Sequence, residues 1–161
     1  MKKLMNLAAA ALTLSALAAP GFAQEKADAV THLKEGKASF EKGCGFCHSL
    51  SRALSKTKSR EEWSQAVKRM VTYGAPLDSG QREAVTAYLT AQSSFKTSCN
   101  TCHSSLRVLS EEAAGKDWKS TVGRMSAHLK ELSKKDKDAR QFSDQDVEEI
   151  AAFLSIVIPA E

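Results

Sequence analysis

The stretch Cys44-Gly-Phe-Cys47-His48 occurs a second time in the chain, 55 residues later, as Cys99-Asn-Thr-Cys102-His103. These two stretches contain all four cysteines of the 161 residues. Cys-x-x-Cys-His is the attachment signature of a c-type haem, in which the cysteines form thioethers to the cofactor and the histidine binds its iron. The pattern therefore predicts two covalent haem c groups on the four cysteines, with His48 and His103 as axial ligands.

Two other uses of the cysteines remain as alternatives. An exported chain can pair its cysteines as disulfides, and two Cys-x-x-Cys pairs can supply a four-thiolate zinc site. A disulfide does not require a histidine directly after each pair, and the two pairs are widely separated for a compact zinc ribbon. Haem attachment is therefore the favoured interpretation.

Sequence similarity extends beyond the motifs and marks a tandem repeat. At the offset of 55 residues Phe40 matches Phe95 and Trp63 matches Trp118; after Met125 the offset grows to 65, where Ala87-Tyr88-Leu89 matches Ala152-Phe153-Leu154. Self-similarity of this kind indicates repeated structural units. We expect three segments: a signal peptide over 1–23, a first small domain over 24–91 and a second over 92–161.

Both repeats are predicted to be helical, with no β-alternation of useful length. Apolar residues recur at helical spacing in three segments of the first repeat: Val30, Leu33 and Phe40; Trp63, Val67 and Met70; and Ala84, Val85, Tyr88 and Leu89. Asp78 and Ser143 are the expected N-caps of the last helix in each repeat.

The junction between the repeats allows two structures. No Pro or Gly lies between Tyr88 and Ser98, so the last helix of repeat one can run straight into the first helix of repeat two. Ser93, Ser94 and Thr97 lower helix propensity, so a kink or short break is the alternative.

The second axial ligand of each iron has few candidates. Met70 and Met125 are the only methionines after residue 23, and each lies seven residues after a tryptophan. We expect both to bind iron; the alternative is core packing by a flexible side chain. His32 and His128 are rival ligands, although neither has a counterpart in the other repeat. Two six-coordinate irons would leave no open position, which predicts an electron carrier and not an enzyme.

The N-terminus is typical of an export signal. Lys2 and Lys3 precede an apolar stretch from Leu4 to about Ala19, and small residues permit cleavage after Ala23. A retained membrane anchor is the alternative; after cleavage no membrane span is expected. The formal net charge of +4 provides no strong basic field, which argues against a nucleic-acid partner.

Basic residues follow the first motif. A loop of this charge can steer an acidic partner protein or be only solvated. Arginine lies four residues after each motif, at Arg52 and Arg107, and can pair with a haem propionate or remain in solvent. The basic residues of the first loop are Arg52, Lys56, Lys58 and Arg60.

The stretch from Gly36-Lys37-x-x-Phe40 through the first motif resembles small periplasmic dihaem c-type cytochromes built from two class I-like units. The Trp63-x6-Met70 pattern is similar to the haem-binding domain of quinohaemoprotein amine dehydrogenases. The resemblance implies an all-α fold of two tandem small cytochrome c-like domains, each around one covalent haem, and haem attachment in the periplasm. It implies that the protein shuttles single electrons between redox partner proteins. The alternative is a haem enzyme or gas sensor with one open or displaceable axial position.

Overall fold

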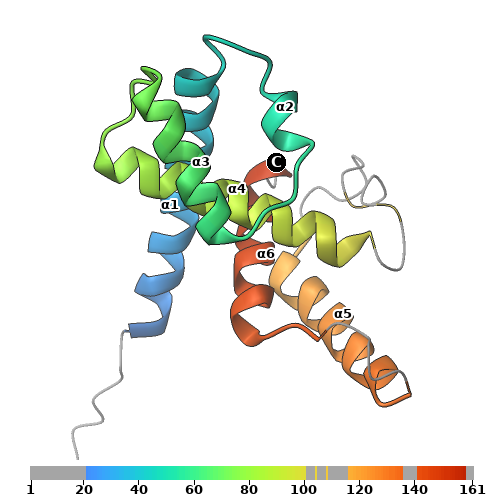
Figure 1. The fold of residues 1–161 in the computed structure, drawn as a ribbon. Coiled ribbons are helices and arrows are strands. Elements are labelled where there is room, and N and C mark those ends of the chain that lie inside the picture. The colour runs from blue at the N-terminus through green and yellow to red at the C-terminus, as the bar shows by residue number, and fades with distance from the viewer. Residues whose placement is uncertain (1–20, 101–103, 105–107, 109–115, 136–140, 159–161) are drawn as a thin grey trace, which may run out of the picture.

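The fold is all-helical in the residues that the computed structural model describes, which are 21–100, 104, 108, 116–135 and 141–158. This confirms the all-α class predicted from the sequence. Six helices and no strand occur in these ranges (Figure 1): α1 (Gly21–Cys44), α2 (Ser51–Leu54), α3 (Arg60–Thr72), α4 (Ser79–Cys99), α5 (Trp118–Ser133) and α6 (Asp144–Val157). Most of the predicted signal peptide, 1–20, lies outside the described residues.

Capping boxes begin three of the helices. In each, the N-cap side chain accepts a hydrogen bond from the N3 backbone N–H, and the N3 side chain accepts one from the N-cap N–H. Asp78 and Ser143 are thereby confirmed as caps. The pairs are Ser59–Glu62 for α3, Asp78–Gln81 for α4 and Ser143–Asp146 for α6.

Helix α4 joins the two repeats. It runs unbroken from Ser79 to Cys99, so the continuous helix is the alternative that the structure adopts. The hydroxyls of Ser93 and Thr97 donate to carbonyls four residues earlier, at 2.9 and 2.8 Å, so they are satisfied within the helix. The domain boundary predicted between residues 91 and 92 lies inside this helix.

One buried core runs through both repeats. Helices α1, α3 and α6 pack against α4, α5 packs against α6, and α1 also contacts α6 (Figure 1). Four aromatic rings form a row across this core. Tilted aromatic pairs at such distances contribute about 0.5–1.5 kcal/mol beyond their buried area. The ring-centroid distances are 5.9 Å for Phe40–Tyr88, 5.8 Å for Tyr88–Phe153 and 5.6 Å for Phe95–Phe153.

The row of rings is symmetrical with respect to the repeat. Phe40 corresponds to Phe95 and Tyr88 to Phe153, so the two outer pairs are the same contact made twice. The central pair, Tyr88 and Phe153, joins one repeat position to its own counterpart. A self-complementary contact of this kind is expected at an approximate two-fold axis. A single repeat is short and would bury only a thin core, and pairing enlarges that core.

Gly36 marks a close approach of α1 to α4, and its replacement tests this packing. A Cβ at Gly36 would lie 2.1 Å from the carbonyl oxygen of Ala84, a backbone atom that moves only if the helix moves. Gly36→Ala is therefore expected to lower the free energy of unfolding by about 1–3 kcal/mol, measured by urea unfolding of the purified protein.

Gly123 in α5 provides the matched control. A Cβ there would meet nothing within 4 Å, so Gly123→Ala is expected to raise the free energy of unfolding by up to about 1 kcal/mol through helix propensity alone. A Gly36→Ala protein as stable as Gly123→Ala would contradict the observed contact between α1 and α4.

Candidate functional site

The first motif begins at the end of α1. Cys44 is the last residue of this helix and is half-buried, and burial raises the pKa of its thiol. Cys47 is exposed, and Phe46 between the two cysteines is 90% exposed. Because α1 is packed into the core through Phe40, four residues earlier, the helix holds the start of the motif in place.

The imidazole of His48 is oriented by a backbone contact. Its Nδ1 lies 3.1 Å from the carbonyl oxygen of Ser49. A carbonyl can only accept, so Nδ1 carries the hydrogen in this contact and Nε2 keeps its lone pair. Hydrogen bonds of this kind fix the tautomer of metal-binding histidines. The geometry is therefore compatible with iron binding through Nε2.

Helix α2, which the sequence did not predict, lies shortly after the first motif and is fastened to α4. The carbonyl oxygen of Leu54, at its end, accepts hydrogen bonds from Gln92 Nε2 at 3.0 Å and Lys96 Nζ at 2.5 Å. A cation at a helix C-terminus also interacts favourably with the helix dipole. The first-repeat segment is thus held by side chains from the second-repeat half of α4.

Trp63 in α3 is anchored to the same stretch of α4. Its Nε1 donates to Ser93 Oγ at 2.8 Å, and the backbone N–H of Lys58 donates to the same oxygen at 3.3 Å. Trp63 and Val67 are buried and Met70 is half-buried. The predicted ligand Met70 therefore lies on a helix whose tryptophan is fixed by a buried hydrogen bond.

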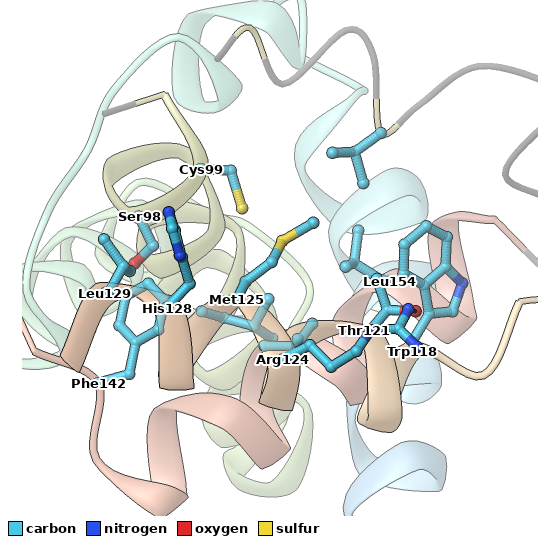
Figure 2. A pocket seen from close by; sticks show the side chains of 13 residues that line it. Ser98, Cys99, Trp118, Thr121, Arg124, Met125, His128, Leu129, Phe142 and Leu154 are labelled. Atoms are coloured by element: carbon cyan, nitrogen blue, oxygen red, sulfur yellow. Dashed lines mark hydrogen bonds between the residues drawn. The ribbon is translucent and has the colours of Figure 1, made fainter. Parts of the chain in front are cut away.

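In the second repeat, a cavity of about 300 Å³ brings several predicted site residues together. Cys99 at the end of α4, Met125 on α5 and the rival ligand His128 all line it, and Figure 2 shows their side chains on this cavity. Largely apolar cavities with a few well-placed donor groups are typical of ligand and cofactor sites. The other lining residues are Ser98, Val108, Trp118, Thr121, Val122, Arg124, Leu129, Phe142, Ile150 and Leu154.

Trp118 lacks the hydrogen bond that its counterpart Trp63 makes. The residue is buried, and its Nε1 has no acceptor within the described chain. In the 65-residue register that relates α4 to α6, Ser93 corresponds to Ile158 and Gln92 to Val157. Neither aliphatic side chain can hydrogen-bond, so α6 does not offer α5 and its flanking segment the anchors that α4 offers α3.

The remaining predicted site residues are placed as follows. Arg52 is exposed, and the rival ligand His32 is half-buried on α1. Cys102, His103 and Arg107 lie outside the described residues, so their roles remain predictions. In the described ranges, no three His, Cys, Asp or Glu side chains are grouped so that they could hold a metal ion.

Comparison with known proteins does not identify a family for this chain. No protein-family model, curated protein or solved structure matches the chain. Among the helices in the described part of the chain, none has the length and apolar character needed to cross a membrane.

Ser93→Ala tests the anchor of α3. The change removes the acceptor of the buried Trp63 indole, so we expect the free energy of unfolding to fall by about 1–3 kcal/mol, measured by urea unfolding followed by circular dichroism. Ser98→Ala on the same helix is the control. The hydroxyl of Ser98 is buried without a partner in the described chain, so its removal should not destabilise the protein. Equal losses in both variants would argue against the anchor.

Proposed function

We propose that this protein is a periplasmic electron carrier that holds two covalent haem c groups and passes single electrons between redox partner proteins, without catalysing a reaction of its own. One observation carries the proposal: Cys99 and Met125, a predicted attachment residue and a predicted iron ligand from different helices, line one apolar cavity. The sequence indicates Cys99 by its Cys-x-x-Cys-His motif and Met125 by its repeat position, and neither signal contains the distance between the two residues.

The lining of this cavity fits a haem. A flat apolar group needs an apolar pocket of several hundred cubic ångströms, and the cavity measures about 300 Å³. Cys99 offers a thiol for attachment, and Met125 offers a sulfur donor on the opposite helix (Figure 2). Arg124, also in the lining, offers a planar guanidinium that suits a carboxylate such as a propionate.

In the first repeat the same roles fall to matched residues. Cys44 and Cys47 would attach the haem, His48 would bind iron through Nε2, and Met70 would supply the second protein ligand. Once bound, the haem supplies one-electron Fe(II)/Fe(III) chemistry, which the protein tunes. Thioether sulfur favours ferrous iron relative to a second imidazole, so Met70 would raise the reduction potential of its site.

The shared core supports a fixed relation between the two sites. Phe40 and Phe95, the outer rings of the aromatic row, each precede the first cysteine of a motif by four residues. Both motifs therefore begin on helices that pack through the same core. Two haems held in this way would form a short relay within one chain, without a flexible tether between them.

A basic surface beside the first motif supports an acidic redox partner. Arg52 and Lys56 are exposed, whereas Arg60 pairs with Glu83 and Lys58 lies over the Trp63 ring, 6.0 Å from its centroid. Complementary charge raises the rate of partner encounter. Of the four basic residues in this loop, Arg52 and Lys56 are therefore the ones proposed to steer the partner.

A haem count tests the proposal directly. The full chain, coexpressed with a bacterial haem-attachment system, is expected to gain the mass of two haems in intact-protein mass spectrometry. Cys44→Ala/Cys47→Ala and Cys99→Ala/Cys102→Ala should each lose one haem, because each motif holds its own. An optical redox titration of the same holoprotein should show two one-electron steps. A purified chain that carries no covalent haem would overturn the proposed function.

A further inference from the structure

The cavity of the second repeat is lined by two side chains that could supply the second ligand of an iron. Met125 and His128 are three residues apart on α5, about 4.5 Å along the helix axis, and both line the cavity that contains Cys99 (Figure 2). No hydrogen bond from the described residues holds the His128 imidazole. Its counterpart in the first repeat is Tyr73, a residue that follows the end of α3 and is 78% exposed.

In the described chain, helix α5 lacks the buried hydrogen bond that anchors α3. The indole N–H of Trp118 has no acceptor in the described chain, whereas that of Trp63 is bonded to Ser93. Gly123 lies within α5 at the position where Lys68 stands in α3, and glycine lowers the stability of a helix. An exposed ion pair, Lys119 with Glu148 at 2.5 Å, links α5 to α6, but such pairs contribute little. The described polar contacts of α5 are thus exposed, while Trp118 and Val122 hold the helix in the core by apolar packing.

We propose that Met125 and His128 exchange as the sixth ligand of the second haem, whereas Met70 is the fixed ligand of the first. This inference rests on the proposed function. Imidazole favours ferric iron and thioether favours ferrous iron, so His128 would bind in the oxidised protein and Met125 in the reduced one. The redox partner supplies the one electron that reduces the iron. Both side chains would bind the iron as neutral donors.

Matched methionine variants test the exchange in the holoprotein. We expect ferric Met70→Ala to show one high-spin haem by electron paramagnetic resonance, because Tyr73 provides no imidazole. Ferric Met125→Ala should stay low-spin at both haems, because Met70 binds the first iron and His128 binds the second. The second haem of this variant should have a lower reduction potential than the second haem of wild type. Met125→Ala/His128→Ala should then show one high-spin haem. A high-spin haem in Met125→Ala equal to that in Met70→Ala would overturn the inference.

A second measurement uses the intact methionine ligands. Oxidised wild type is expected to show about half the far-red sulfur-to-iron charge-transfer absorbance per chain that His128→Ala shows, because only Met70 would bind ferric iron in wild type. His32→Ala serves as the control and should match wild type. Equal absorbance in His128→Ala and wild type would overturn the exchange while leaving the two-haem carrier intact. Absence of covalent haem would instead overturn the proposed function, and the exchange with it.

Discussion

The contact between Tyr88 and Phe153 is the interaction on which the rest of the structure depends. It joins the last helices of the two repeats, α4 and α6. Each ring also packs against a phenylalanine that lies four residues before a motif, Phe40 or Phe95. The packing that unites the repeats is therefore the packing that positions Cys44 and Cys99. A change at the central pair would disturb both candidate sites together.

Much of the secondary structure could be predicted because its signals are local. Asp78 and Ser143 are recognisable caps by residue type and by a polar residue three positions later, and the apolar stripe from Trp63 to Met70 has helical spacing. Helix α2 could not be predicted because four residues carry no periodicity. The contacts that hold it come from Gln92 and Lys96, about forty residues away in the chain.

The tertiary packing of the helices could be predicted less well from the sequence. A repeat shows which positions are equivalent, but not which faces of the two units meet, so the row of aromatic rings was not foreseen. The motif spacing selected Cys99, Met125 and His128 as candidates, and only the structure shows that they line one cavity. The 65-residue register places Ile158 at the position that corresponds to Ser93. The structural consequence of this difference depends on the hydrogen bond that Trp63 donates to Ser93.

The difference between the two sites follows from the double role of α4. Residues Gln92 to Lys96 belong to the second repeat by sequence, yet they fasten the first repeat's α2 and α3. Helix α6 corresponds only to the first part of α4, and at the register of these anchors stand its last residue, Val157, and the next residue, Ile158. Two repeats that share one helix in this way thus do not give both units the same support. If both units bind haem as proposed, equal motifs would give unequal sites, one with a rigid ligand and one with a mobile ligand, and this inequality would give electron transfer between them a direction.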